Sequence, residues 1–227
     1  MLDTRYGSLF YIPSSNLYLL LNESYELGKI LPKFVNNDTV FVDIGAHIGL
    51  YTLWACKRAR RVVSIEPNPE ALVYLKTNIA LNKCSNVTVV PKVVGDRRGF
   101  TKLKIPKIAG KRFIPTSSSI VRDFDKTLKV NEVDVEMDTL DNILDEIGVD
   151  EVDFIKVDVE EAEGLVVKGA QKTLEKAKTI LIEIRPKNIW VARYLQNIGY
   201  KLVEAVEYRD YRNYLFVKQV LEARREL

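Results

Sequence analysis

Residues 40–52 read VFVDIGAHIGLYT, and this stretch decides the fold. A run of apolar, mostly β-branched residues ends at Asp43, and two glycines, Gly45 and Gly49, then flank a tight turn into a helical pattern. Glycine lets the backbone adopt a positive φ, or approach another group closely where a Cβ would clash. The helix that follows presents free N–H groups to a bound ligand. The stretch therefore predicts a β-strand, a ligand-binding turn and a helix, in that order.

Short apolar runs alternate with helical patterns from residue 39 onward, which is typical of a parallel sheet covered by helices. The runs lie at Val40–Ile44, Arg61–Ile65, Val87–Val90, Phe154–Val157 and residues 179–183. Their continuous apolar character predicts strands that are buried on both faces. Further along the chain, residues 188–198 predict a helix. Residues 202–206 and 214–217 predict an antiparallel pair of strands at one edge of the sheet.

Length and composition bound the domain organisation. The 227 residues suffice for one well-buried core, and 47% apolar with 29% charged residues is typical of a globular protein. We expect one α/β domain over residues 39–227, preceded by an N-terminal helical flank or lid over residues 1–38. Residues 219–227 predict a short charged helix.

Basic residues gather at residues 97–122. This stretch interrupts the alternation of strands and helices, and it holds eight Lys or Arg residues and no Asp or Glu. The rest of the chain is acidic, although the net charge of the whole is +3. Two interpretations remain open: a solvated loop, which most charge runs are, and an insertion that faces an anionic ligand.

Few residues suit metal or redox chemistry. His47 is the single histidine, which excludes a site with several histidine ligands. Cys56 and Cys84 form no CxxC pair, and we expect each to be a buried, inert thiol. Few cysteines, no export signal and no apolar run long enough to cross a bilayer predict a cytoplasmic protein without a transmembrane segment. Scarce Cys, Met and His beside abundant Lys, Arg and Glu are typical of thermophilic proteins.

Two classes of ligand use a glycine turn at the start of a helix. A dinucleotide places its pyrophosphate there, with the fingerprint GxGxxG. Here the glycines are spaced GxxxG, and the carboxylate of Asp43 would repel a pyrophosphate. S-adenosyl-L-methionine has no phosphate, and its ammonium and sulfonium tolerate a nearby acid. The predicted S-adenosyl-L-methionine site comprises Asp43, Gly45, His47 and Gly49. We expect His47 first to pack within the cofactor loop, and only second to act as a base.

Glu66 supports this interpretation. It follows the second apolar run, 23 residues after Asp43. In a doubly wound fold that position faces a ribose, and a carboxylate there can accept hydrogen bonds from both sugar hydroxyls. Asn68 and Pro69 then supply an N-cap and a first helical residue, which predicts a helix that ends near Asn82.

Six pieces of sequence occur in order over roughly residues 40–185. They are VDIGAHIG at 42–49, EPNP at 66–69, TLD at 139–141, FIKVDVEEAE at 154–163, KGA at 168–170 and IEI at 182–184. Together they resemble the FkbM-type methyltransferases, a branch of the S-adenosylmethionine-dependent class I enzymes. The block around Asp158 is the most distinctive of the six.

The resemblance implies an α/β, Rossmann-like class I methyltransferase fold. Its sheet is mostly parallel and seven-stranded with an antiparallel last strand, and helices cover both faces. The resemblance also implies methyl transfer, commonly to oxygen, with cofactor contacts at Asp43, Gly45 and Glu66. Two positions depart from the family, which usually has Asn or a similar small polar residue at His47 and Gly at Glu161. The second departure adds an acid beside the expected reaction centre.

Three carboxylates are the catalytic candidates: Asp158, Glu160 and Glu183. All three fall at carboxyl ends of strands, where open α/β sheets bind their ligands, and Asp158 is also expected to contact the cofactor. Methyl transfer from a sulfonium requires alignment, and a hydroxyl acceptor benefits from a base. Clustered carboxylates raise at least one pKa and so supply that base. Alternatively, Asp158 and Glu160 cap a helix that begins near Gly164. Nothing in the pattern requires a metal.

Three functions are compatible with the sequence. The first is O-methylation of a small-molecule, sugar or lipid-linked hydroxyl. The second is methylation of tRNA or rRNA, with residues 97–122 as a phosphate-binding arm. Against the second, that segment carries only Phe100 and Phe113 as stacking aromatics, and Asp-Val-Glu-Glu stands where a base-methylating Asn-Pro-Pro-Tyr signature would follow the strand. The third is a non-catalytic subunit that binds the cofactor.

Overall fold

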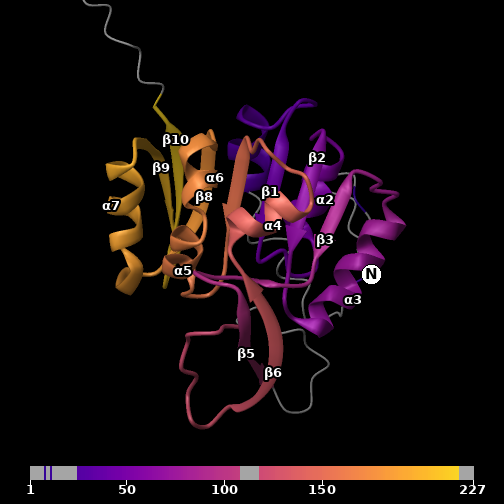
Figure 1. Cartoon of the computed structure of the whole chain (residues 1–227), viewed down its shortest axis with the longest axis vertical. Helices are drawn as coiled ribbons and strands as arrows, with labels where there is room; N and C mark the ends of the chain where they lie inside the picture. The colour runs from indigo at the N-terminus through magenta and orange to yellow at the C-terminus, as the bar shows by residue number, and fades with distance from the viewer. Residues whose placement is uncertain (1–7, 9–10, 12–24, 108–117, 220–227) are drawn as a thin grey trace, which may run out of the picture.

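The central sheet of the computed structural model, which describes residues 8, 11, 25–107 and 118–219, confirms the predicted mostly parallel architecture (Figure 1). Its seven strands have the order β3-β2-β1-β7-β8-β10-β9. Five of them lie at the predicted apolar runs and pair in parallel. They are β1 Val40–Ile44, β2 Arg61–Ile65, β3 Val87–Val90, β7 Phe154–Val157 and β8 Thr179–Ile184.

The expected antiparallel pair stands at one edge of the sheet. Strand β9 is Tyr200–Glu207 and strand β10 is Arg212–Lys218. Strand β10 lies between β8 and β9 and runs antiparallel to both. The short connection between the two strands allows this pairing, because a parallel neighbour would need a long crossover.

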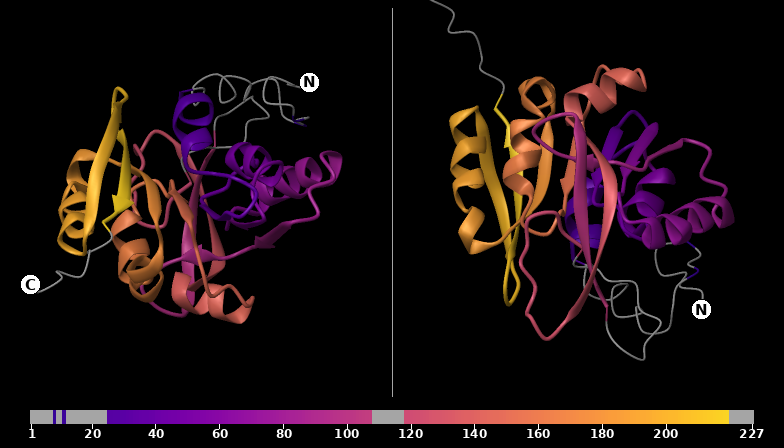
Figure 2. Two further views of the ribbon diagram at one scale, coloured as in Figure 1. Left: turned by 90° about the horizontal axis from the view of Figure 1, so that it is seen from above. Right: turned by 60° about the horizontal axis from the view of Figure 1, so that its bottom comes forward.

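Helices cover both faces of the sheet, as the views in Figure 2 show. One face packs Phe41, Phe154 and Leu181 against α2 Leu50–Cys56, α3 Pro69–Leu81 and the helical turns Glu26–Ile30 and Leu31–Lys33. The other face carries α4 Leu140–Glu146, α5 Glu163–Lys168, α6 Gln171–Lys176 and α7 Trp190–Asn197. Helix α3 begins as predicted, with Asn68 accepting a hydrogen bond from the N–H of Glu70. None of the helices in the described ranges has the length and apolar character needed to cross a membrane.

Most of the expected N-terminal flank lies outside the described residues, as does the helix expected at residues 219–227. The described part of the flank is the two turns at Glu26–Ile30 and Leu31–Lys33. Leu27, Ile30 and Leu31 are buried in the same cluster as the sheet residues Phe41 and Phe154. These turns therefore belong to the core of the domain.

The connection order creates a switch point beside β1. The chain goes outward from β1 to β2 and β3, and it then returns to place β7 on the other side of β1. The loops that leave the carboxyl ends of β1 and β7 therefore diverge. In open α/β sheets a ligand crevice lies at this place.

A second, three-stranded sheet follows β3 in the chain, in the order β4-β6-β5. It consists of β4 Val93–Val94, β5 Gly99–Lys107 and β6 Lys129–Asp138. Its own small core contains Val93, Leu103, Ile105, Val135 and Met137. Figure 1 shows β5 and β6 extending away from the main sheet. The described first half of the basic stretch is thus a paired strand and not a loop.

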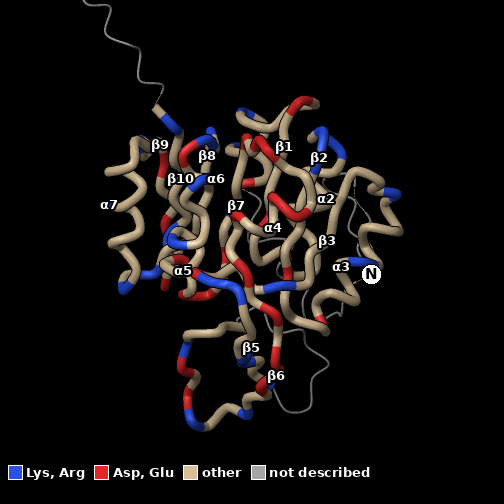
Figure 3. Tube along the Cα trace, viewed as in Figure 1, with Lys and Arg blue, Asp and Glu red and all other residues tan. Residues whose placement is uncertain are grey.

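Some cations at the start of β5 lie beside acids of β6, as the two colours side by side in Figure 3 show. Lys102 Nζ lies 3.6 Å from Glu132 and 3.7 Å from Asp134, and Arg98 Nε lies 2.8 Å from Asp138. The net positive charge counted over residues 97–122 is therefore largely compensated where the structure describes it. The count of charged residues over 97–122 missed these acids because they come later in the chain.

Two of the family motifs have structural roles. Asp141, in the TLD piece, accepts hydrogen bonds from the N–H groups of Lys172 and Thr173 at 3.0 and 2.9 Å, at the start of α6. Gly169, in the KGA piece, is pressed against the backbone, because a Cβ there would lie 1.9 Å from the carbonyl oxygen of Gly95. These pieces thus join α4 to α6.

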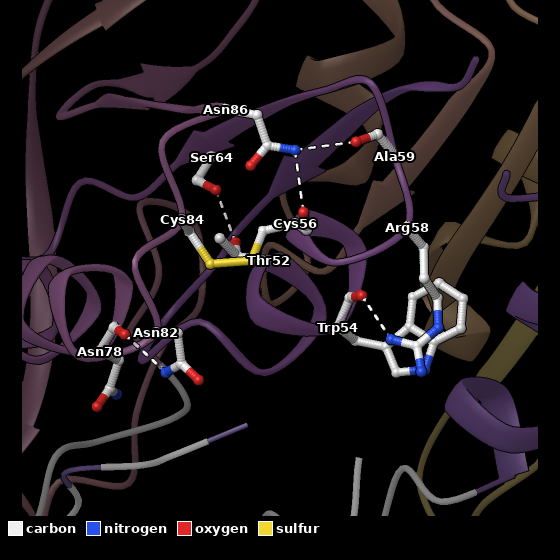
Figure 4. Close-up of a disulfide and its surroundings, with 10 residues drawn as sticks. All are labelled: Thr52, Trp54, Cys56, Arg58, Ala59, Ser64, Asn78, Asn82, Cys84 and Asn86. Atoms are coloured by element: carbon white, nitrogen blue, oxygen red, sulfur yellow. Dashed lines mark hydrogen bonds between the residues drawn. A yellow bond between two sulfur atoms is a disulfide. The ribbon is translucent and has the colours of Figure 1, made fainter. Parts of the chain in front are cut away.

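The prediction of two free thiols is wrong, because Cys56 and Cys84 form a disulfide (Figure 4). Cys56 ends α2 and Cys84 follows α3, and packing on the same face of the sheet brings their Cα atoms to 5.8 Å. Asn86 Nδ2 donates to the carbonyl oxygens of Cys56 and Ala59 at 3.0 and 2.9 Å and so fixes the same corner. The disulfide ties together the far ends of the two helices that begin at the glycine turn and after Glu66.

Removing this disulfide will destabilise the fold. It closes a loop with a sequence separation of 28 residues, and a bridge of that span contributes about 3–4 kcal/mol by restricting the unfolded chain. We expect a Cys56→Ser, Cys84→Ser double variant to lose about that amount in urea unfolding. A reductant should destabilise the wild type similarly and leave the variant unchanged. Two thiols that titrate in the native, unreduced protein would contradict the assignment.

Candidate functional site

A cavity of about 330 Å³ lies at the switch point. The ends of β1, β2, β7 and β8 line one part of it, and the second sheet contributes Val93, Val94 and Leu103. Its wall includes six of the residues expected from the sequence, namely Gly45, His47, Glu66, Asp158, Glu160 and Glu183. Two other expected residues, Asp43 and Gly49, do not line it.

The glycine turn is shaped by backbone contacts. Gly45 has a φ of +80°, and a Cβ on it would lie 1.8 Å from the carbonyl oxygen of Asp158. Gly49 has a φ of +97° and is the N-cap of α2. The N–H groups of Gly45 and Ala46 both donate to the carbonyl oxygen of Ile65, at 2.9 and 3.1 Å. Both glycines are therefore required by the turn itself, and these two N–H groups are used within the protein.

His47 occupies the left-handed region, with a φ of +52°. Asparagine tolerates this region better than most residues, which accounts for its use at this position in the family. The backbone N–H of His47 donates to Glu66 at 2.7 Å. His47 thus connects the turn to the end of β2, consistent with a packing role in the loop.

Asp43 lies beneath the turn. It is fully buried, and its Oδ2 accepts a hydrogen bond from Thr52 Oγ1 at 2.7 Å, while Oδ1 has no hydrogen bond to any described residue. Burial raises the pKa of Asp43, and the nearby ammonium of Lys156 opposes that rise. When ionised, this carboxylate places negative potential under the turn, which suits a cationic ligand and disfavours a pyrophosphate.

Glu66 lies in the cavity wall with both carboxylate oxygens engaged. Oε2 accepts from the N–H of His47 at 2.7 Å and Oε1 from the N–H of Asn68 at 2.8 Å. Burial raises the pKa of Glu66 to about 7, and these two hydrogen bonds oppose the rise. A carboxylate offers about four lone-pair sites, so acceptor capacity remains for ribose hydroxyls. The donor and acceptor set of the cavity therefore fits S-adenosylmethionine.

The three catalytic candidates meet at one side of the cavity. One carboxylate oxygen from each of Asp158, Glu160 and Glu183 lies within 4.8 Å of the other two. Burial, together with the charges of Asp158 and Glu160, holds the pKa of Glu183 well above its ordinary value. Lys156 Nζ lies 3.1 Å from Asp158 Oδ2. The cluster thus joins carboxyl groups in different electrostatic environments.

Two arginines complete this side of the cavity. Arg122 Nη1 and Arg185 Nη2 both donate to Glu160 Oε2, at 2.8 and 2.9 Å. Arg185 also lies 5.7 Å from the ring centre of Tyr211, another lining residue. The sequence did not single out Arg185 or Tyr211, although Arg185 directly follows a strand end, which is a signal for a cavity residue.

The turn after β7 is strained. Glu160 and Glu161 have φ values of +48° and +82°, a region that costs a residue with a Cβ about 1–2 kcal/mol. Glycine avoids that cost, which explains its use in the family at position 161. The alternative in which Asp158 and Glu160 cap a helix is wrong, because the N-cap of α5 is Ala162 and it makes no side-chain capping bond.

Residues 118–122 cross the cavity from the second sheet. Ser118 Oγ accepts from Asn68 Nδ2 at 3.0 Å, and Ser119 Oγ donates to the carbonyl oxygen of Glu160 at 2.6 Å. The two preceding polar residues, Thr116 and Ser117, lie outside the described residues. The described segment connects the side of Glu66 with the acid cluster.

Several known proteins with similar sequences or folds are methyltransferases. The tRNA (guanine(37)-N(1))-methyltransferase Trm5b of Methanocaldococcus jannaschii is 30% identical over 152 residues, which are 60% of this chain and 44% of the relative. The chain spans less than half the length of the curated relatives it matches.

Two solved structures show the same fold. The FkbM methyltransferase of Methylobacillus flagellatus gives a TM-score of 0.54 at 19% identity, over 88% of this chain and 53% of that one. An rRNA methylase of Streptococcus thermophilus gives a TM-score of 0.54 at 10% identity, over 87% of this chain and 95% of that one.

The methyltransferase FkbM domain matches residues 43–215. This range is more than half of the chain, and it contains the glycine turn, Glu66, the acid cluster and the second sheet. The match confirms the resemblance drawn from the motifs, and with it S-adenosyl-L-methionine as the cofactor. The chain therefore belongs to the FkbM family of S-adenosylmethionine-dependent methyltransferases.

Proposed function

We propose that the chain methylates a hydroxyl oxygen of a small-molecule, sugar or lipid-linked acceptor, with Asp158, Glu160 and Glu183 as its catalytic group. The observation that carries the proposal is Glu183, a buried carboxyl in the cavity wall whose pKa is raised by burial and by two neighbouring acids. A hydroxyl must lose its proton as its oxygen is methylated. A carboxyl with a raised pKa is a stronger base for that proton than an ordinary one.

The cofactor side of the cavity is proposed to consist of Gly45, His47 and Glu66, with Asp43 and Gly49 beneath. Glu66 would accept hydrogen bonds from the ribose hydroxyls, and the charge of Asp43 would favour the cationic part of the ligand. When bound, S-adenosylmethionine supplies a methyl group on a sulfonium, which is a good leaving group.

The three acids are proposed to divide the work. Glu160 already accepts from Arg122 and Arg185 through one oxygen, so it holds the two guanidinium groups at the cavity wall. Asp158 and Glu183 are left to receive the proton of the acceptor, and Asp158 also borders the cofactor side.

Replacing Glu66 with Ala should weaken cofactor binding about 10- to 100-fold, because charge-assisted hydrogen bonds of this kind contribute about 1.5–3 kcal/mol. Calorimetry with S-adenosylmethionine or its demethylated product measures the loss. Since Glu66 has a pKa of about 7 and accepts best when ionised, wild-type affinity should fall as the pH is lowered from 8 to 6. The exposed Glu70→Ala, at the start of the same helix, is the matched control. Wild-type affinity in Glu66→Ala would remove this residue from the site.

Replacing Glu183 with Gln should lower kcat by about 10²- to 10⁴-fold, the usual contribution of a general base. A base works only when deprotonated. The raised pKa of Glu183 therefore predicts that wild-type kcat increases with pH, in a pH range above the one in which an ordinary carboxyl loses its proton. The Glu183→Gln variant should lose this increase of kcat with pH and keep its affinity for the cofactor. The exposed Glu207→Gln is the control and should behave as wild type. Unchanged kcat and pH dependence in Glu183→Gln would exclude it as the base.

RNA methylation is the second candidate, favoured by the 30% identity to a tRNA methyltransferase. The described cations weaken it, because Arg98 and Lys102 are paired with acids across the hairpin. Lys107 is the exposed end of β5, and two further cations of the proposed arm, Lys111 and Arg112, lie outside the described residues.

Labelled cofactor and fractionated cell extract distinguish the candidates. We expect label in small molecules or lipid, and weak RNA binding that Lys107→Ala, Lys111→Ala and Arg112→Ala together barely change. An RNA arm would instead give tight binding that weakens steeply with salt and with this triple variant, because neutralised phosphates release counterions. Cofactor binding without label in any pool would favour the non-catalytic subunit.

We also propose a cytoplasmic location. Intracellular proteins of hyperthermophiles keep disulfides, and the composition of this chain is typical of thermophilic proteins. The Cys56–Cys84 bond is therefore compatible with the location. Recovery of the protein outside the cytoplasmic fraction of its source cells would overturn it.

A further inference from the structure

The left-handed turn at Glu160 and Glu161 needs external support. Two consecutive residues with a Cβ occupy positive φ there, shortly after the end of β7 and Asp158. Such conformations persist only where the surroundings fix them, and they are concentrated at functional sites. The contacts of this turn therefore indicate what holds the acid cluster in place.

Glu163 and Asn188 hold both backbone polar groups of Glu161. Glu163 Oε1 accepts from the N–H of Glu161 at 2.8 Å, and Asn188 Nδ2 donates to the carbonyl oxygen of Glu161 at 2.8 Å. The two side chains are joined, because the same Nδ2 donates to Glu163 Oε2 at 2.6 Å. We call this arrangement the Glu163–Asn188 clamp. It holds the peptide group before Glu161 through its N–H and the peptide group after Glu161 through its carbonyl oxygen.

Glu163 is an unusual residue to place at this position. It is 0% exposed, it does not line the cavity, and it makes no ion pair with any described residue. Burial raises its pKa to about 7, with the hydrogen bonds from Asn188 and Glu161 opposing the rise. A buried carboxyl without a cation is unfavourable for folding. General stability therefore does not account for it, whereas fixing the turn does.

We propose that Glu163 is a positioning residue for the methyl-transfer reaction, acting with Asn188 to hold the left-handed turn that presents Asp158 and Glu160 to the acceptor. The inference rests on the proposed function of the acid cluster. Glu163 itself touches neither cofactor nor acceptor, so its effect passes through the geometry of the turn.

The chemistry of the clamp requires a carboxylate. Its two oxygens accept from two donors, the N–H of Glu161 and Nδ2 of Asn188. An amide at position 163 can accept at one end only, so its NH₂ would face the NH₂ of Asn188. Rotating Asn188 by 180° relieves that conflict, and then the carbonyl oxygen of Glu161 loses its donor. Glu163→Gln therefore breaks one bond of the clamp in either arrangement while keeping size and shape.

The first test compares kcat with cofactor affinity. We expect Glu163→Gln to lower kcat at least about 10-fold and to leave the calorimetric Kd for S-adenosylmethionine within about two-fold, because Glu66 and the glycine turn are untouched. Glu175→Gln, at an exposed position on α6, is the matched control. A kcat unchanged in Glu163→Gln, or a Kd that weakens as much as kcat falls, would overturn the positioning role.

The second test asks whether strain connects Glu163 to the turn. Glycine adopts a φ of +82° without strain, so the clamp should matter less in a Glu161→Gly background. We expect Glu163→Gln to lower the melting temperature by about 3–6 °C in the natural background, the shift of a modest destabilisation in a chain of this size, and clearly less in the Glu161→Gly background. The fold decrease in kcat caused by Glu163→Gln should also be smaller in the Glu161→Gly background. Equal effects in both backgrounds would overturn the clamp.

The melting-temperature cycle needs no acceptor, so it separates two kinds of failure. A wild-type protein that turns over no acceptor would defeat the proposed function. A smaller effect of Glu163→Gln on the melting temperature in the Glu161→Gly background would still show that the clamp acts on the turn. Additive melting temperatures together with normal wild-type turnover would defeat the clamp and leave the proposed function intact.

Discussion

The contact between Gly45 and the backbone of Asp158 constrains everything around the cavity. A Cβ at position 45 would lie 1.8 Å from the carbonyl oxygen of Asp158, so only glycine lets β1 and β7 end side by side. The N–H of Asp158 donates to the carbonyl oxygen of Ile44 at 3.0 Å and secures the same approach from the other strand. Because of this contact, the glycine turn, whose His47 N–H donates to Glu66, and the turn that carries Asp158 and Glu160 border one cavity.

Glu160 and Glu183 differ in how closely cations pair with them in this cavity. Glu160 accepts from two guanidinium groups within 2.9 Å, whereas the nearest cation to Glu183 that forms an ion pair is Arg185, at 3.5 Å. Burial and the neighbouring charges therefore act on Glu183 with less compensation, and its pKa rises further. Two chemically identical side chains thus lie in different electrostatic environments, and the one proposed as the base is the one with less compensation from cations.

Local patterns of the sequence were sufficient for the main sheet and for much of the site. Buried parallel strands are continuous apolar runs, so β1, β2, β3 and β7 could be placed to the residue, and Glu66 followed from its distance along the chain. Contacts between distant segments were not accessible in this way. Cys84 reaches Cys56 only because α2 and α3 pack on one face, and Arg185 binds Glu160, a residue of the turn after β7. The acids that pair with Arg98 and Lys102 lie on β6, beyond the stretch over which charge was counted.

The acid at position 161 connects the strain of the turn to the chemistry of the cavity. Glycine would relax the backbone at a φ of +82°, yet Glu161 adds a carboxylate that pairs with Lys187 and lies 3.8 Å from Arg122. Arg122 in turn comes from the segment that crosses the cavity from the second sheet. A glycine here would leave both cations with one fewer partner. The departure from the family pattern therefore changes the ion pairs beside the acid cluster, because Arg122 also binds Glu160.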